Sequence, residues 1–471
     1  MTPRDQPVRL AISGQHHRAL KSHLFPGDGK EAVAFALCGR ARRADVELLA
    51  VRDIIPIPHD QCRIRTPVTI VWPGAALEPI LTRAASEGLA VVKIHSHPNG
   101  YPWFSSTDDI ADADMFPSVF GWLDSDAPLA SMIMMPDGRL IGRVVREEGA
   151  GEPLDLVRLA DNDFTFWPGR EGLVAVPEHG RRIAQAFGDR TYSLLRQLRI
   201  GVVGASGTGS ILIEQLARNC VAELVIVDPD HVEEKNLNRI LNSTSADAQV
   251  HLNKAALQQR AIAAMGLGTT VRTFACDLLD REVLEALSTC DILIGCVDSV
   301  DGRHLLNKLA SAYVIPLIDM GVRLDADGVG GIDSIVCAVH TIVPGGSSLF
   351  SRRVYSQADL DAAFLKRSDP LGYQLQLKAG YVKGQLVDRP AVISVNMAVA
   401  SAAMNELLAR LHPFRVEPNY RYAMRRFSLT DPDASFDAPD GEPCSVMGRL
   451  VGSGDQEPFL GMPLLAGKKG A

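Results

Sequence analysis

The chain has 471 residues, more than one ordinary hydrophobic core holds, so we expect at least two domains. Hydrophobic residues make up 46% and charged residues 22%, which is typical of a globular protein in water. The net charge of −8 argues against general nucleic-acid binding, and no apolar run approaches the ~20 residues that a membrane-spanning helix needs. The eight cysteines are scattered without CxxC pairs, which predicts reduced thiols and a cytoplasmic location.

The first 150 residues have the pattern of one small α/β domain. Residues 18–24 and 73–89 carry apolar residues at helical spacing. Apolar runs predict strands over residues 31–38, 46–55, 89–94, 129–135 and 140–145. The last two runs flank Pro136-Asp137-Gly138, which predicts a hairpin turn.

Two histidines stand at the end of the third of these strands. His95 and His97 are two residues apart, so both imidazoles point to the same side of the sheet. Together with Asp108 they make two imidazoles and a carboxylate, which with one open position is the ligand set of a catalytic zinc. Glu31, on an earlier strand, is the candidate for accepting the proton of a zinc-bound water. The alternative is that the two histidines are ordinary polar residues at a strand end.

The spacing of these residues resembles the JAB/JAMM metallopeptidase signature: a glutamate, then H-x-H-P, six residues, S, two residues and D. The matching positions are Glu31, His95, His97, Pro98, Ser105 and Asp108. The resemblance implies hydrolysis of a peptide or isopeptide bond that follows the C-terminal glycine of a ubiquitin-like protein. It also implies zinc ligation by His95, His97 and Asp108, a general-base role for Glu31, and stabilisation of the oxyanion by Ser105.

Residues 199–239 predict a βαβ unit that binds phosphate. An apolar run at 200–203 is followed by glycines, and then by a helical pattern over 210–219 and a second apolar run at 224–227. Glycines let backbone N–H groups approach an anion at the start of the helix. The three glycines of this turn are Gly204, Gly207 and Gly209. Asp228 ends the second strand, where a carboxylate can bind a ribose hydroxyl.

The continuation after Asp228 resembles the ubiquitin-activating-enzyme superfamily of the ThiF/MoeB/HesA type. This family reads G-x-G-G-x-G-S, then D-x-D-x-V, then N-L-x-R-Q. The chain follows this pattern over about residues 180–430, with Asp228, Asp230, and Asn236-Leu237-Asn238-Arg239 in place. It departs at Ser206, where the family has a glycine, and at Ile240, where the family usually has glutamine.

The resemblance implies an adenylyltransferase that uses ATP and Mg²⁺ on the C-terminal glycine of a ubiquitin-like protein. It assigns nucleotide contacts to Gly204, Gly207, Gly209, Asp228, Asp230, Asn236, Arg239 and Lys254. Asp298 follows the strand predicted over 291–297 and would hold magnesium; the alternative is a helix cap. The resemblance also implies a homodimer, in which Arg181, or alternatively Arg182, reaches the nucleotide of the partner subunit.

The acyl acceptor is open. Relatives often carry cysteines just after the segment equivalent to Pro344-Gly345-Gly346, but this chain has Ser347, Ser348 and Ser351 there. Only Cys444 remains of a second CxxC pair, so we expect no structural zinc in the adenylating domain. The acyl group passes directly to its next acceptor, or to Cys444, or to one of the three serines as an oxyester.

These patterns predict an α/β protein whose N-terminal JAB/JAMM-type mixed α/β domain precedes a Rossmann-like ThiF adenylation domain. The expected boundaries are 1–150 for the first domain, 151–178 for a linker, 179–435 for the second domain and 436–471 for a tail. An apolar helix is expected over 390–411.

The function that follows is a bifunctional enzyme of a bacterial ubiquitin-like conjugation system. It would work with a conjugating-enzyme-like partner and, by analogy, in antiphage defence. Two alternatives use the same residues differently. One is a catalytically degenerate scaffold that binds a ubiquitin-like protein. The other is a nicotinamide-dependent oxidoreductase, which gives no reason for Asn236-Leu237-Asn238-Arg239 or Lys254.

Overall fold

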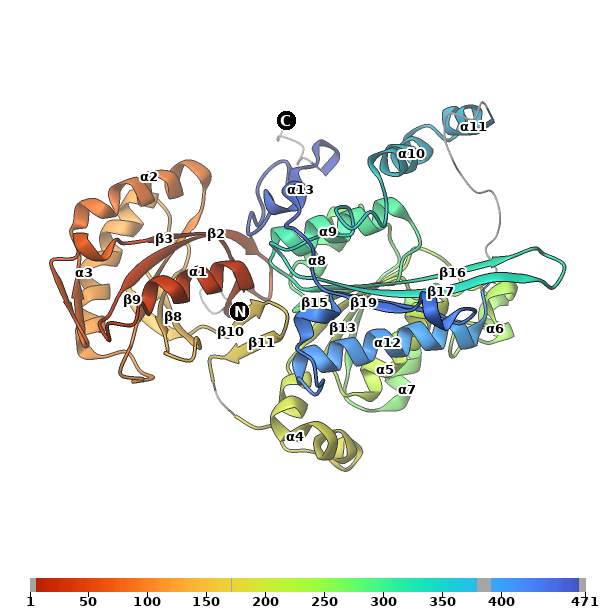
Figure 1. Cartoon of the computed structure of the whole chain (residues 1–471), viewed down its shortest axis with the longest axis horizontal. Helices are drawn as coiled ribbons and strands as arrows, with labels where there is room; N and C mark the ends of the chain where they lie inside the picture. Colours follow the sequence, from red (N-terminus) through yellow and green to blue (C-terminus); the bar gives the residue numbers. More distant parts are fainter. Residues whose placement is uncertain (1–5, 171, 379–390, 466–471) are drawn as a thin grey trace. The chain divides into compact units, whose positions relative to one another are not determined.

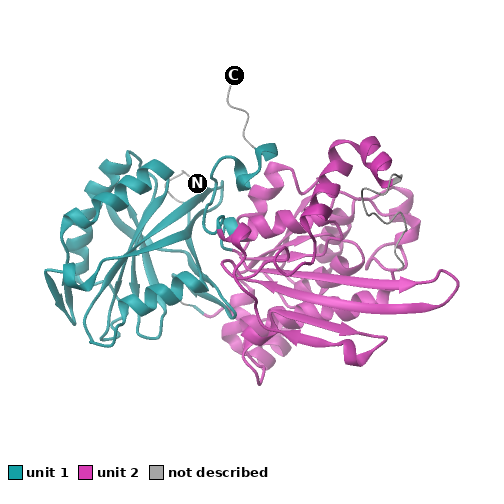
Figure 2. Cartoon of the chain, turned by 45° about the horizontal axis from the view of Figure 1, so that its top comes forward, with its two compact units in different colours: residues 1–172, 311–314, 449–471 teal, residues 173–310, 315–448 magenta. Residues whose placement is uncertain are grey.

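The computed structural model describes residues 6–170, 172–378 and 391–465 (Figure 1). The chain divides into two compact units (Figure 2). Unit 1 comprises residues 1–172, 311–314 and 449–471, and unit 2 comprises residues 173–310 and 315–448. Both units are mixed α/β, as the sequence predicted.

Unit 1 is built on a nine-stranded sheet with the order β11-β10-β1-β3-β2-β6-β7-β8-β9. Its strands are β1 (Val8–Ser13), β2 (Val33–Arg42), β3 (Glu47–Pro56), β6 (Ala90–Ser96), β7 (Leu129–Met134), β8 (Leu140–Arg146), β9 (Gly149–Pro153), β10 (Leu156–Ala160) and β11 (Phe164–Pro168). A separate hairpin pairs β4 (Ile64–Thr66) with β5 (Thr69–Val71). The strands at the centre of the large sheet are apolar along most of their length because both of their faces are buried.

The α-helices of unit 1 among the described residues are α1 (Gly14–Leu24), α2 (Glu78–Glu87) and α3 (Ser106–Leu123). Helix α1 packs on β1, β2 and β3, whereas α2 and α3 pack against each other. Gly88 ends α2 in the left-handed conformation, at φ +65°, which glycine adopts without a Cβ clash. A capping box between Ser105 and Asp108 starts α3 and fixes where that helix begins.

The predicted linker is wrong over most of its N-terminal part. Residues 151–168 carry the end of β9 and all of β10 and β11, and β10 pairs in parallel with β1 at the start of the chain. Glycine, proline and mixed charge suggested a linker, but Leu156, Val157 and Leu159 are buried by a strand that lies about 150 residues away in the sequence.

Unit 2 is built on an eight-stranded sheet with the order β14-β13-β12-β15-β16-β17-β18-β19. Its strands are β12 (Arg199–Val203), β13 (Glu223–Val227), β14 (Thr270–Phe274), β15 (Ile292–Gly295), β16 (Leu317–Ala326), β17 (Ile332–Ile342), β18 (Met424–Ser428) and β19 (Phe436–Ala438). The first five are parallel and the last three extend the sheet antiparallel. The chain order reverses between β12 and β15, and the crevice at such a switch point is where this kind of sheet binds ligands.

Helices cover both faces of this sheet. The α-helices of unit 2 among the described residues are α4 (Arg181–Leu195), α5 (Gly207–Arg218), α6 (Ser245–Gln249), α7 (Lys254–Met265), α8 (Arg281–Leu287), α9 (Val300–Ala312), α10 (Gln357–Ser368), α11 (Pro370–Lys378), α12 (Ile393–Leu411) and α13 (Ser445–Gly448). Figure 1 shows α5, α7 and α12 on one side of the sheet and α8 and α9 on the other. Pro390, where the predicted apolar helix was to begin, lies outside the described residues.

The predicted tail is also structured over most of its length. Residues 436–438 form β19, and the described part of 449–471 belongs to unit 1. There Gly39 donates its N–H to Gly452 O at 3.0 Å, and the Asp455 carboxylate accepts from Arg43 at 2.7 Å. Proline, glycine and aspartate accumulate from Asp431 onward and suggested a tail, but this segment is held by backbone pairing and by the ion pair with Arg43. Residues 466–471 lie outside the described part.

In the described part of the chain, none of the helices combines the length and the apolar character that a bilayer crossing requires.

Candidate functional site

The end of β6 carries the two histidines into one buried cluster. β2 and β6 pair antiparallel with Val33 opposite His95, and residues 95 and 97 lie on the same face of the sheet. The residues His95 and His97 are only 2% and 4% exposed. The predicted common orientation of the two imidazoles is therefore found in the structure.

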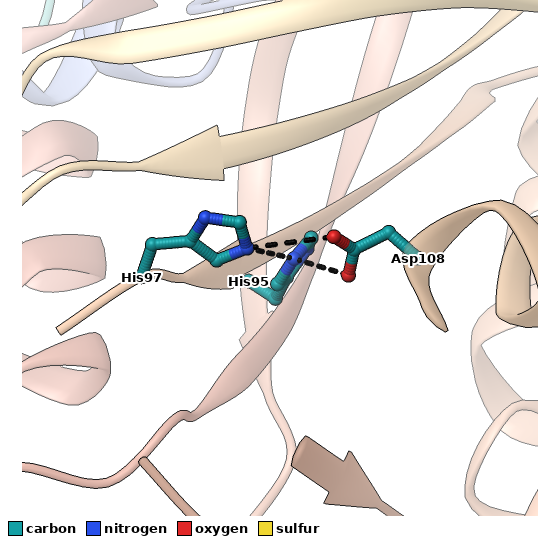
Figure 3. A group of neighbouring side chains, drawn as sticks. All are labelled: His95, His97 and Asp108. Atoms are coloured by element: carbon teal, nitrogen blue, oxygen red, sulfur yellow. Dashed lines mark hydrogen bonds and ion pairs between the residues drawn. The ribbon is translucent and has the colours of Figure 1, made fainter. Parts of the chain in front are cut away.

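Asp108 reaches the same cluster from the first turn of α3 (Figure 3). Its Oδ1 atom lies 2.9 Å from Nε2 of His95, and its Oδ2 atom lies 3.5 Å from Nε2 of His97. Ser105 donates to Oδ2 from its backbone N–H at 2.6 Å and from its hydroxyl at 2.7 Å. Ser105 thus caps the helix and orients Asp108, and its predicted oxyanion role stays a prediction.

The protonation of the cluster suits a cation. Nδ1 of His97 lies 2.7 Å from the carbonyl oxygen of Tyr101, so Nδ1 donates its proton to that oxygen and Nε2 faces His95 and Asp108. Burial opposes protonation of His97, but the bonds to Asp108 and to Tyr101 raise its pKa overall, whereas burial lowers the pKa of His95. A carboxylate that stabilises a proton on a neighbouring imidazole nitrogen also stabilises a metal ion, which competes with the proton for that nitrogen.

The geometry fits a divalent cation. The two Nε2 atoms of His95 and His97 lie 3.1 Å apart, and the ligand atoms of the three residues all lie within 4.8 Å of one another. This is the one group of three or more such side chains that converge in this way among the described residues. Two imidazoles and one carboxylate leave one tetrahedral position open, which is the donor set of a catalytic zinc.

Glu31 lies beside the cluster, just before β2. The pairing of β2 with β6, continued past Ala32 and Ser96, places Glu31 opposite His97. The β4–β5 hairpin holds its backbone, since Glu31 N donates to Thr66 O at 2.8 Å and Arg65 Nε donates to Glu31 O at 2.9 Å. Burial, with a smaller contribution from Asp108, raises the pKa of the Glu31 carboxyl to about 7. A carboxylate with such a pKa is suited to accepting a proton near neutral pH.

A buried charged array next to the cluster was missed by the sequence reading. Lys93 forms an ion pair with Asp112, and Arg143 of β8 donates to the other oxygen of Asp112 at 2.7 Å. The side chains of Lys93 and Asp112 are 3% and 1% exposed. The available signal was spacing: Lys93 stands two residues before His95 on the strand, and Asp112 stands four residues after Asp108 on the helix.

In unit 2 the glycine turn lies at the switch point of the sheet. Gly204 has φ +96°, and a Cβ added there would lie 2.7 Å from the carbonyl oxygen of Cys296, which follows β15. A Cβ at Gly209 would lie 1.9 Å from Gly204 O. The two glycines thus let the turn after β12 fold tightly at the start of α5, as phosphate binding requires.

Three predicted nucleotide contacts gather at the end of β13. Asp228 accepts N–H bonds from Ala205 at 2.6 Å and from Asp230 at 2.9 Å, which ties the carboxylate to the glycine turn. Burial raises its pKa. Lys254, at the start of α7, donates from Nζ to Asp230 at 2.8 Å.

Asn236 and Arg239 lie on the segment between β13 and α6. Asn236 is buried, and its side chain accepts from Glu233 N at 3.1 Å. The Arg239 stem lies next to the turn, since a Cβ added at Gly207 would come within 3.4 Å of Arg239 Cδ. Its guanidinium donates to Lys235 O at 2.7 Å.

Two predicted residues lie on the surface. Asp298 is exposed in the loop after β15, at the carboxyl edge of the sheet, where one carboxylate together with nucleotide phosphates would make a magnesium site. Arg181 is exposed at the start of α4 and pairs with Glu178 at 3.0 Å. Within the described part of the subunit, it makes no contact with the glycine turn.

Three of the candidate acyl acceptors, Ser347, Ser351 and Cys444, line one cavity of about 450 Å³. Burial raises the pKa of the Cys444 thiol, but hydrogen bonds from the backbone of Met447 and the hydroxyl of Ser348 outweigh that effect and lower it overall. Ser347 instead donates its hydroxyl to Asp440.

A doubly wound sheet with this glycine turn, followed by Asp228, Asn236 and Arg239, defines a nucleotide-binding protein of the adenylyltransferase class. Residues 179–440, more than half of the chain, match the model of the ThiF family, and the chain belongs to that family. Residues 13–145 match the model of prokaryotic homologs of the JAB domain, so a JAB domain precedes the ThiF domain. Both predicted resemblances are confirmed.

Curated relatives match the ThiF part. The chain is 25% identical over 183 residues to the sulfur carrier protein ThiS adenylyltransferase of Bacillus subtilis, covering 38% of this chain and 54% of that protein. It is 25% identical over 245 residues to ubiquitin-like modifier-activating enzyme 5 of Arabidopsis thaliana, covering 48% and 55%. The chain therefore spans about half the length of these relatives. A crystal structure of Escherichia coli MccB with ATP is 16% identical, with 60% and 76% covered and a TM-score of 0.44.

Proposed function

We propose that this protein is a bifunctional enzyme of a bacterial ubiquitin-like conjugation system. Unit 2 adenylates the C-terminal glycine of a ubiquitin-like protein, and unit 1 cleaves the peptide or isopeptide bond that follows that glycine. The observation that carries the proposal is the convergence of His95, His97 and Asp108 beside Glu31 in a chain that also belongs to the ThiF family.

In the adenylation step, an oxygen of the glycine carboxylate forms a bond to the α-phosphorus of ATP, and the bond from that phosphorus to the bridging oxygen of pyrophosphate breaks. Asp228 holds the ribose, and the glycine turn receives the phosphates. Lys254 and Arg239 stabilise the negative charge that develops on the leaving pyrophosphate. Magnesium at Asp298 would neutralise phosphate charge when bound.

In the cleavage step, zinc held by His95, His97 and Asp108 would acidify a water molecule and polarise the scissile carbonyl. Glu31 accepts the proton of that water and returns it to the leaving amine. Ser105 keeps the Asp108 carboxylate oriented through two hydrogen bonds. The loop at Tyr101 sets the tautomer of His97 through the carbonyl oxygen of Tyr101.

The proposed assembly is a homodimer in which Arg181 contacts the nucleotide of the partner subunit. Arg181 is exposed, and it is not among the residues that we propose as phosphate ligands within its own subunit. A conjugating-enzyme-like protein receives the activated modifier, either directly or from Cys444 or one of the neighbouring serines. A role in antiphage defence is an analogy with compact bacterial systems of this kind.

The test uses the full-length chain with a β-grasp protein that ends in glycine. ATP–pyrophosphate exchange reports adenylation, and release of a C-terminal extension from the same protein reports cleavage. We expect His97→Ala to abolish cleavage and leave exchange intact, and Arg239→Ala to do the reverse. The two-site proposal would be contradicted if either folded variant lost both activities. It would also be contradicted if the wild-type protein showed neither activity.

A further inference from the structure

Strand β6 and helix α3 face each other through two successive pairs of charged or polar side chains. His95 meets Asp108 at 2.9 Å, and Lys93 forms an ion pair with Asp112. The spacings match: two residues of strand rise ~6.8 Å and four residues of helix rise ~6 Å. The lysine pair therefore lies one step behind the metal cluster, along the same strand and the same helix.

Arg143 of β8 extends this array to the start of the helix. It donates to Asp112 from Nη2 at 2.7 Å and from Nε at 3.2 Å, and to Asp109 at 2.5 Å. Its guanidinium also lies 3.9 Å from the ring centroid of Phe104, directly before the helix cap. The array thus fixes both the rotation of α3 and the loop that leads into it.

Stability alone is a weak reason for such an array. Taking Lys93 and Asp112 out of water costs about as much as their attraction returns, and apolar replacements of buried ion pairs are often neutral or stabilising. What an ion pair adds over an apolar contact is a specific direction. Here the ion pair orients α3 so that the helix face that carries Asp108 points toward the histidines.

We propose that Lys93, Asp112 and Arg143 are positioning residues for the His95–His97–Asp108 metal site. They hold α3 in the rotation that brings the Asp108 carboxylate to the two Nε2 atoms. This inference rests on the proposed metal site, and the array itself touches neither substrate nor reacting atoms.

The test compares two apolar replacements of buried ion pairs in the full-length protein. Lys93→Met/Asp112→Leu removes the positioning pair. Arg40→Met/Glu47→Leu removes a pair of the same unit, 2.7 Å apart with side chains 16% and 6% exposed, that joins β2 and β3. Both are measured by the zinc dissociation constant against a competing chelator, by the visible spectrum of the Co²⁺-substituted protein, and by melting temperature.

We expect the positioning variant to bind zinc on the order of 10–100-fold more weakly and to show an altered Co²⁺ spectrum. The Arg40/Glu47 control keeps the wild-type affinity and spectrum at a similar melting temperature. If Lys93→Met/Asp112→Leu does not fold, Arg143→Lys replaces it: this variant keeps the charge but loses the two-point contact with Asp112, and the same weakening is expected.

Wild-type affinity and spectrum in a folded positioning variant would overturn the inference while leaving the proposed function intact. Equal weakening in the control pair would also overturn it, because the effect would then follow general loss of packing. A wild-type protein that binds no zinc would overturn the proposed metal site and this inference together.

Discussion

The ammonium group of Lys254 lies 2.8 Å from a carboxylate oxygen of Asp230, so two residues that we propose for one nucleotide site form an ion pair with each other. The Lys254 side chain is 7% exposed, whereas that of Asp230 is 68% exposed. The lysine is therefore held in place by a residue of the same proposed site. Because the Asp230 side chain faces solvent, it can turn away when phosphates bind the ammonium group of Lys254.

Replacing Lys254 tests its role in adenylation. We expect Lys254→Ala to lower the rate of ATP–pyrophosphate exchange by about 10²–10³-fold, since one fixed donor to the developing charge is lost. Lys235→Ala is the matched control, because Lys235 is exposed and its ammonium group lies 3.1 Å from the exposed Glu233 carboxylate. Exchange at the wild-type rate in Lys254→Ala would remove this lysine from the phosphate site.

The glycine turn gives a second prediction. Gly204→Ala is expected to lower the melting temperature and to abolish ATP binding. The left-handed backbone costs about 1–2 kcal/mol with a Cβ, and that Cβ meets the Cys296 carbonyl at 2.7 Å. Gly328→Ala controls for the backbone alone, since Gly328 has φ +79° with nothing within 4 Å. Calorimetric ATP titration checks the difference, and equal ATP affinity in both variants would contradict it.

Glu31 separates proton transfer from metal binding. We expect Glu31→Gln to slow cleavage by about 10²–10⁴-fold, because the amide cannot accept a proton. Zinc affinity and ATP–pyrophosphate exchange should stay at wild-type values, since Glu31 is not one of the three converging ligands. Glu78→Gln, an exposed change on α2, is the control. A Glu31→Gln protein that cleaves normally would assign the base to another residue.

Two buried histidines should each contribute a loss of stability in mild acid. Burial lowers the pKa of His340 to about 3 and that of His304 to about 4. Between these values and 6.5 the unfolded chain binds more protons than the folded one. The contribution of each neutral histidine to stability therefore rises with pH up to about 6.5 and is flat above it, with a slope of ~1.4 kcal/mol per pH unit. Glu31 and Asp319, whose pKa values are raised to about 7 and about 6, contribute slopes of the opposite sign below those values.

This pH dependence is checked by calorimetric melting between pH 4 and 7, with measurements about half a pH unit apart. His340→Gln should flatten the slope, although it also changes a buried contact at neutral pH. His179→Gln, at an exposed position, should leave the slope as it is. An unchanged slope in His340→Gln would mean that this histidine is not the titrating group.

The sequence by itself determined the parts of this protein that depend on local spacing. Alternation along β6 put His95 and His97 on one face, and the spacing from His97 to Ser105 and Asp108 matched the metallopeptidase signature. Glycine spacing after β12 located the phosphate turn, because only glycine tolerates the backbone and the close contacts found there. These sequence patterns lie within one or two neighbouring elements, so they can be recognised without knowing which distant segments pack against them.

Only the tertiary structure decided what depends on distant segments. β10 and β11 look like a linker until β10 pairs with β1 and β11 pairs with β10, and the described segment after residue 449 looks like a tail until it joins unit 1. Lys93, Asp112 and Arg143 are ordinary charges in the sequence and become one buried array only when β6, α3 and β8 meet. Pairing energy between segments far apart in the chain is set by the geometry of the fold, which no local pattern encodes.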